Sequence, residues 1–100
     1  MILNLNNYDI VVNDPWDIVD LFETRLAEYA GSKYAVCVDS CSNAIFLCLK
    51  YLKITNQTIE LPKHTYVSVP MQCINAGNKI RFVDKVWSGE YQLGHTPIID

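Results

Sequence analysis

The stretch YAVCVDSCSNAIFLCLK, residues 34–50, decides how the rest of the chain is interpreted. A β-branched apolar run ends in a short polar turn, and a second apolar run begins at once. Apolar side chains on both faces are typical of a buried parallel strand, so we expect a strand over residues 33–40. The second run, residues 42–54, indicates a helix that is apolar nearly all round, which we expect to be well covered.

The polar turn between the two runs raises the question of what it holds. The first amides of a helix have no partner inside the helix and point outward with the positive end of its dipole. An anion is the natural ligand of such a helix start. The sequence therefore predicts an anion site at the amides of residues 41–43, beside the hydroxyls of Ser40 and Ser42.

Alternating apolar segments continue on both sides of this stretch. Upstream, residues 1–13 indicate an extended arm or short strand, and Asp14-Pro15-Trp16-Asp17 is a helix start with Asp14 as the cap. Gly31 ends that helix. Downstream we expect strands at residues 58–63, 79–84 and 96–100, a helix over 65–77 that accommodates Pro70 only in its first turn or at a kink, and a turn at Ser88-Gly89.

This order of segments predicts an α/β fold with a mostly parallel sheet and helical crossovers. We expect residues 1–15 to be an N-terminal arm and residues 16–100 to belong to one domain. Ligands bind at the carboxyl ends of the strands in such sheets. Residues at the expected strand ends are Ser40, Cys41, Ser42, residues 63–66, Asp84 and Asp100.

Composition excludes several classes of function. The net charge is −3 and no basic stripe is visible, so we do not expect a nucleic-acid partner. No apolar run approaches the ~20 residues that span a bilayer, and the N-terminus lacks a signal-peptide pattern, so we expect a cytoplasmic protein without a membrane partner. The four cysteines form no C-x-x-C pair, so we expect reduced, buried thiols with neither a metal nor a disulfide.

Two interpretations of the polar residues stay open on these grounds. A helix start with two serines next to the flat ring of Tyr66 suits a planar, phosphorylated cofactor. A serine-rich helix start is far more often only a cap, and an aromatic residue at a strand end is more often part of the core.

The order of motifs along residues 16–84 narrows the choice. An acidic helix ends at Gly31, a strand leads to Ser40-Cys41-Ser42, and then come Pro62, Thr65-Tyr66, Ala76-Gly77 and Phe82-Val83-Asp84. This series resembles the N-terminal part of the DegT/DnrJ/EryC1/StrS family. These are fold-type I aminotransferases that depend on pyridoxal 5′-phosphate and act mostly on nucleotide-linked keto-sugars. The resemblance implies that the chain is the N-terminal part of such a large domain.

The resemblance also assigns roles to particular residues. Cys41 and Ser42 would present backbone amides, and Ser42 also its hydroxyl, to the cofactor phosphate, with Ser40 beside them, and Tyr66 would stack on the pyridine ring. Asp100 would accept a hydrogen bond from the pyridine nitrogen and keep that nitrogen protonated, although it follows Asp84 at a shorter spacing than is usual in the family. Cys41 stands where the family has glycine, so its side chain narrows the approach to the amides unless it points into the core.

The resemblance implies an enzyme that is incomplete in these 100 residues. The family's Schiff-base lysine lies beyond residue 100, and Lys63 and Lys79 do not match its position, so we assign no catalytic residue here. The complete enzyme would be a homodimer that moves an amino group from an amino-acid donor to a keto-sugar nucleotide. The alternatives are a catalytically inert truncated homologue that serves as a binding or interaction module, and an unrelated small α/β domain.

Overall fold

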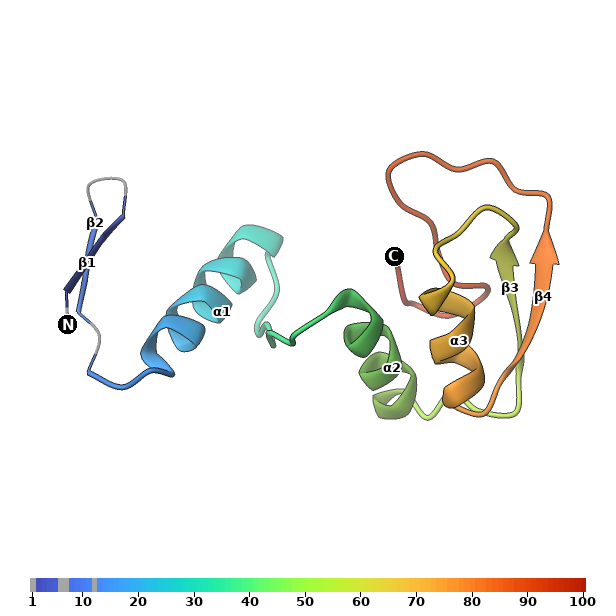
Figure 1. Cartoon of the computed structure of the whole chain (residues 1–100), viewed down its shortest axis with the longest axis horizontal. Helices are drawn as coiled ribbons and strands as arrows, with labels where there is room; N and C mark the ends of the chain where they lie inside the picture. Colours follow the sequence, from blue (N-terminus) through green and yellow to red (C-terminus); the bar gives the residue numbers. More distant parts are fainter. Residues whose placement is uncertain (1, 6–7, 12) are drawn as a thin grey trace. The chain divides into compact units, whose positions relative to one another are not determined.

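A computed structural model describes residues 2–5, 8–11 and 13–100, with side chains described for residue 11 and for 13–100 (Figure 1). The chain divides into two compact units, Met1–Cys37 and Val38–Asp100. In the first unit, β1 (Ile2–Leu5) pairs antiparallel with β2 (Tyr8–Val11), so that Ile2 lies opposite Val11. This hairpin agrees with the extended structure expected for residues 1–13, except that residues 1, 6, 7 and 12 lie outside the described part.

The helix of the first unit, α1, spans Asp17–Ala30 and begins later than the sequence predicts. The Asp14 carboxylate accepts the Trp16 N–H at 2.9 Å, and the Asp14 carbonyl accepts the Asp17 N–H at 3.0 Å. Residues 14–16 therefore form a separate turn before the helix. Asp14 accepts the backbone N–H groups of this turn instead of capping α1. At the other end the helix stops as expected, since Gly31 adopts the left-handed conformation with φ 69°.

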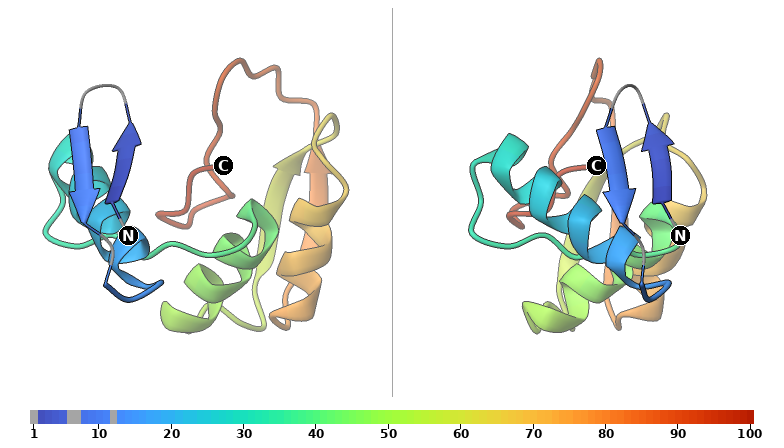
Figure 2. Two further views of the ribbon diagram at one scale, coloured as in Figure 1. Left: turned by 60° about the vertical axis from the view of Figure 1, so that its left-hand side comes forward. Right: turned by 90° about the vertical axis from the view of Figure 1, so that its left-hand side faces the viewer.

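The second unit contains a β-α-β unit that follows the prediction. The strands β3 (Thr58–Pro62) and β4 (Lys79–Val83) pair in parallel and are joined by α3 (Ser68–Asn75). Figure 2 shows the two arrows running in the same direction. Pro70 is the third residue of α3, where the missing N–H costs no hydrogen bond. The result is a small α/β unit with a parallel two-stranded sheet.

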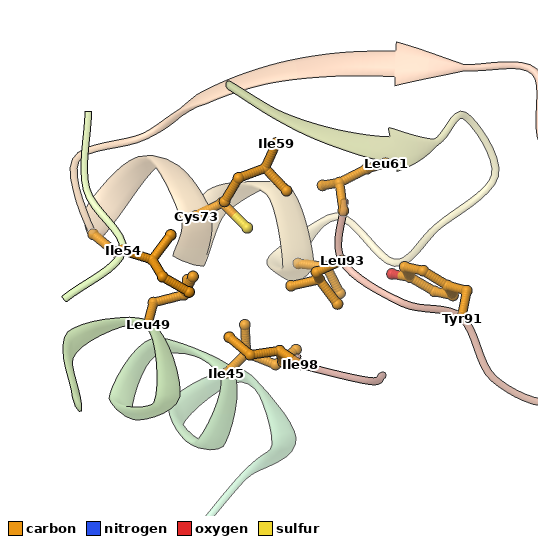
Figure 3. Packing of buried hydrophobic residues seen from close by; sticks show 11 residues of the cluster. Ile45, Leu49, Ile54, Ile59, Leu61, Cys73, Tyr91, Leu93 and Ile98 are labelled. Carbon is orange, nitrogen blue, oxygen red and sulfur yellow. The ribbon is translucent and has the colours of Figure 1, made fainter. Parts of the chain in front are cut away.

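One helix, α2 (Cys41–Tyr51), packs against α3 in this unit. Its buried side chains, Ile45 and Leu49, meet Ile59 and Leu61 of β3 in the core (Figure 3). The rest of the cluster comes from the loop between α2 and β3, from α3 and its C-terminal end, and from the segment after β4; its labelled members there are Ile54, Cys73, Tyr91, Leu93 and Ile98. The core therefore lies between one face of the sheet, the two helices and the C-terminal segment.

The C-terminal segment folds as a narrow hairpin. Tyr91 and Asp100 exchange both backbone hydrogen bonds, at 3.2 and 2.9 Å, and Gln92 forms a bridge with Ile99. The Gly94 N–H donates to the Glu60 carbonyl at 3.1 Å, which ties the hairpin to β3. The strand expected over residues 96–100 is thus reduced to one bridge, because the turn at residues 94–97 leaves only three residues on either side for pairing.

The strand expected over residues 33–40 is absent, and this prediction was wrong. No strand in the described part of the chain pairs with these residues. The Cys37 N–H instead donates to the Glu23 carboxylate at 3.3 Å. Tyr34 and Val36 are 75% and 81% exposed. An apolar run becomes a buried strand only when a neighbouring strand satisfies its backbone, and these residues have none.

Two expectations about burial also need correction. The α2 helix is covered on one side only, since Leu47 is 50% and Tyr51 86% exposed. Among the cysteines, Cys73 is buried as expected, whereas Cys37 is partly buried and Cys41 and Cys48 are exposed. The exposure of Leu47, Cys48 and Tyr51 follows from the small size of the sheet, because it has two strands and one face of α2 suffices to cover it.

The described ranges lack two features, a helix suited to crossing a membrane and a cluster of side chains suited to holding a metal ion. None of the helices there combines the length and apolar composition that crossing a membrane requires. The histidine, cysteine, aspartate and glutamate side chains of these ranges form no group of three or more that would hold a metal ion.

Candidate functional site

The start of α2 is built by a serine cap. Ser40 is extended, with φ −155° and ψ 155°, and its Oγ accepts the Asn43 N–H at 3.2 Å. The Ser40 carbonyl accepts the Ala44 N–H at 3.0 Å. This corrects the expectation of three free amides, because Asn43 is already satisfied by the cap. The amides of Cys41 and Ser42 have no hydrogen-bond partner among the described residues.

A second helix start lies next to the first. The Ser42 hydroxyl is 2.7 Å from the hydroxyl of Ser68, the first residue of α3. Each hydroxyl has one proton and can turn, so one of the two donates to the other, which can in turn donate to a third group. The dipoles of α2 and α3 thus bring their positive ends to the same place. Neither helix has an acidic residue in its first turn.

The Cys41 side chain does not point into the core. It is exposed, and its Sγ donates to Oδ1 of Asp100 at 3.4 Å. This hydrogen bond is the main reason why the pKa of the Cys41 thiol is raised, with burial and the Asp100 charge adding to it. The structure therefore brings together two predicted site residues that are 59 positions apart.

Asp100 is held in place by the C-terminal hairpin. Because Tyr91 and Asp100 exchange both backbone hydrogen bonds, they are directly opposite and their side chains lie on the same face. The Tyr91 hydroxyl is hydrogen-bonded to the Thr65 hydroxyl. The pKa of Tyr91 is raised to about 12, chiefly by burial; the Thr65 hydrogen bond lowers this pKa, and Asp100 and Cys73 raise it.

The loop that carries Tyr66 is fixed by a tryptophan. Trp87 Nε1 donates to the His64 carbonyl at 2.8 Å, and the Trp87 ring lies 4.9 Å from that of Tyr91. Tyr66 itself is 74% exposed. This exposure contradicts the alternative that the aromatic residue belongs to the core, and it leaves the Tyr66 ring accessible to a ligand.

Two other polar features lie outside this group. At the ends of the two strands, Lys63 and Asp84 form an exposed ion pair of 2.8 Å, which contributes little to stability. A hollow of about 80 Å³ is lined by other residues of the second unit, namely Glu60, Pro62, Val83, Lys85, Gln92, Gly94 and His95. None of the predicted site residues is among them.

The donor set at the start of α2 fits a phosphorylated heterocycle. Two free amides and two hydroxyls are the groups that bind phosphate oxygens at helix starts. The Asp100 carboxylate, which contacts the side chain of the first residue of the same helix, is an acceptor for a protonated nitrogen. Pyridoxal 5′-phosphate carries both features, so the residues present are compatible with it.

Sequence reasoning missed Ser68 and Tyr91 as members of this group, and it named Thr65 only as a residue at a strand end. A signal for Tyr91 was present, because Tyr91-x-Leu93 and Ile98-x-Asp100 flank a Gly-His-Thr-Pro turn and so predict a hairpin with Tyr91 opposite Asp100. Ser68 precedes Pro70 at a helix start, which marks it as a first-turn residue. Neither signal alone shows that these side chains meet α2.

Comparisons with known proteins support one family. The model of the DegT/DnrJ/EryC1/StrS aminotransferase family matches residues 12–90, which is most of the chain. Searches of curated proteins and of solved structures found no match. The matched range contains Ser40, Cys41, Ser42 and Tyr66 and ends before Asp100.

Proposed function

Since the chain belongs to the DegT/DnrJ/EryC1/StrS aminotransferase family, we propose that it is the N-terminal part of a pyridoxal 5′-phosphate-dependent enzyme. The enzyme transfers an amino group from an amino-acid donor, glutamate in the first instance, to a nucleotide-linked keto-sugar. The observation that carries this proposal is the start of α2. Its two free amides lie next to the hydroxyls of Ser42 and Ser68 and to the carboxylate of Asp100.

The residues of the chain bind and orient the cofactor. The amides of Cys41 and Ser42 and the Ser42 hydroxyl donate to its phosphate. The helix dipole contributes only ~0.3–1 kcal/mol, so these hydrogen bonds supply most of the affinity. The exposed ring of Tyr66 stacks on the cofactor ring. Asp100 accepts a hydrogen bond from the ring nitrogen and keeps its proton in place.

The cofactor, when bound, supplies an electron sink for the charge that develops when a proton leaves the substrate carbon. Moving that proton requires an amine on the protein, which the family supplies from a lysine. Lys63 is engaged with Asp84, and Lys79 is the first residue of β4. We therefore propose that these 100 residues alone hold the cofactor and do not complete the transfer.

A second candidate function is an interaction module without catalysis. The α2 helix exposes apolar side chains, since Tyr51 is 86% and Leu47 is 50% exposed. Exposed apolar surface of this kind is usually covered by another protein chain. We propose that this surface promotes self-association of the chain. In the enzyme, the same surface is covered when the subunit folds and forms a homodimer. Sedimentation that shows a monomer at high concentration would contradict self-association.

The cofactor proposal is tested by binding. Pyridoxamine 5′-phosphate is the suitable probe because it lacks the aldehyde that would react with surface lysines. Replacing Ser42 by alanine should weaken its binding by roughly fivefold, the value of one hydrogen bond of about 1 kcal/mol. Ser88→Ala, at the exposed turn between β4 and the hairpin, is the matched control and should bind as the wild type does. Equal affinity for Ser42→Ala and the wild type would remove Ser42 from the site.

The catalytic part of the proposal has a separate test. The chain is incubated with glutamate, pyridoxal 5′-phosphate and a keto-sugar nucleotide, and the amino-sugar product is measured. We expect no product above a protein-free control. Turnover that Lys63→Ala or Lys79→Ala abolishes would show that a lysine within these residues moves the proton.

A further inference from the structure

The Asp100 carboxylate is held by its own chain and keeps one oxygen free. Its backbone is fixed by two hydrogen bonds to Tyr91, whose side chain is bonded to Thr65. Its Oδ1 accepts the Cys41 thiol at 3.4 Å, and its Oδ2 has no hydrogen-bond partner among the described residues. An ionised carboxylate has lone pairs on both oxygens, so Oδ2 is available to a second donor.

The donor to Oδ1 comes from the helix start that is proposed to bind phosphate. Cys41 is the first residue of α2, and its own amide is one of the two that are free there. One residue thus offers an N–H to an anion and an S–H to Asp100. A thiol is a weak donor, and its hydrogen bond to a charged acceptor is stronger than one to a neutral group.

We propose that Cys41 is a positioning residue for Asp100. Its thiol donates a hydrogen bond to Oδ1 and so orients the carboxylate. Oδ2 then accepts a hydrogen bond from the protonated ring nitrogen of the cofactor. The inference rests on the proposed function and adds to it a role for the side chain of Cys41. The side chain at this position therefore does not obstruct the helix start, because it is turned toward the carboxylate. No bond is made or broken in this step, and the proton stays on the ring nitrogen.

The hydrogen bond itself is tested without any cofactor. The rate of alkylation of Cys41 by iodoacetamide is measured against pH, with the modified peptide identified by mass spectrometry because Cys48 is also exposed. The Asp100 carboxylate raises the pKa of this thiol. The midpoint of the profile should therefore move to lower pH in Asp100→Asn. An unchanged midpoint would mean that the contact does not form in solution and would overturn the proposal.

The positioning role is tested with two ligands and three variants of Cys41. The ligands are pyridoxamine 5′-phosphate and its analogue with carbon in place of the ring nitrogen. Cys41→Ala removes the donor, Cys41→Ser keeps one, and Cys41→Gly removes the whole side chain. We expect Cys41→Ala and Cys41→Gly to bind pyridoxamine 5′-phosphate roughly fivefold more weakly, as for the loss of one hydrogen bond. Cys41→Ser should bind within about twofold of the wild type, and none of the three should alter binding of the carbon analogue.

The outcomes separate this inference from the proposed function. If Cys41→Ala weakens the binding of both ligands equally, Cys41 affects only the binding of the phosphate group, and the positioning role is overturned. If Cys41→Ser binds as weakly as Cys41→Ala, the role is overturned in the same way. If the wild type binds neither ligand, the proposed function fails first and the inference falls with it. In an Asp100→Asn background, Cys41→Ala should have no further effect on pyridoxamine 5′-phosphate.

Discussion

The starts of α1 and α2 differ in the charges beside their first amides. At α1, Asp17 and Asp20 lie in the first turn, and the Asp17 carboxylate accepts the N–H groups of Asn13 and Asp14, just before the helix, both at 2.9 Å. At α2 the first turn has no acidic residue, and the amides of Cys41 and Ser42 have no hydrogen-bond partner among the described residues. Both helices have a positive end, but the carboxylates in the first turn of α1 oppose an external anion, whereas the first turn of α2 leaves its positive end open to one.

The two helices also differ in how firmly each is held within its own unit. On α1, Ala27 is the one buried side chain, and Phe22 and Leu26 are 55% and 38% exposed. On α2, Ile45 and Leu49 are almost inaccessible, at 3% and 0%. A binding site needs a fixed geometry, and the helix with the open start is the one that the core fixes.

The largest effect expected from this difference is on stability. Leu49→Ala removes a fully buried side chain from the core and should lower the free energy of unfolding by about 3 kcal/mol. Leu26→Ala makes the same change on α1 and should cost about 0.5 kcal/mol, since the side chain is partly exposed. Denaturant unfolding followed by far-ultraviolet circular dichroism, which reports the helices of both units, measures both losses. Similar losses for the two variants would contradict the unequal packing of the helices.

A smaller effect is expected from the cap of α2. Ser40→Ala removes the oxygen that accepts the Asn43 N–H and should cost about 1 kcal/mol of unfolding free energy. Ser40→Asp restores an acceptor and should recover most of that loss. Because Asp also brings a negative charge to the helix start, Ser40→Asp should bind phosphate more weakly than the wild type does. Tighter binding by this variant would show that the anion lies elsewhere.

The smallest expected effect is the dependence of the stability of α1 on pH in the acid range. Hydrogen bonds from the backbone of Asp14 and Asn13 lower the pKa of the Asp17 carboxyl below its usual value of 3.8. A lowered pKa means that the contribution to stability is present above that usual value and is lost as the pH falls through the folded value. The helicity of α1 should therefore decrease at strongly acid pH. Asp17→Asn, followed by circular dichroism, should lack this dependence.

The sequence predicted the local features that single residues determine. Gly31 ends α1 because its positive φ suits glycine. For Pro70 the sequence left open the first turn or a kink, and the start of α3 at Ser68, later than the predicted residue 65, places it in the first turn. The strands β3 and β4 were also predicted, since their apolar runs and the helix between them follow a simple β-α-β pattern.

The sequence failed where distant segments decide the outcome. Residues 33–40 have the composition of a buried strand, but composition does not show whether another strand is available to pair with them. The contact between Cys41 and Asp100 depends on the hairpin that places Asp100 opposite Tyr91. The sequence predicted Cys41 and Asp100 as separate site residues at different strand ends. Only the fold shows that their side chains are in contact.

The central claim is that the open start of α2 binds the phosphate of the cofactor. The most direct measurement is a titration of the ¹⁵N-labelled chain with pyridoxamine 5′-phosphate, followed by the amide resonances of each residue. The account predicts saturable shifts of the Cys41 and Ser42 amides, which inorganic phosphate competes away, and no shift at the amides of Asn13 and Asp14 before α1. Shifts at the start of α1, or unchanged Cys41 and Ser42 amides at saturating ligand, would contradict it.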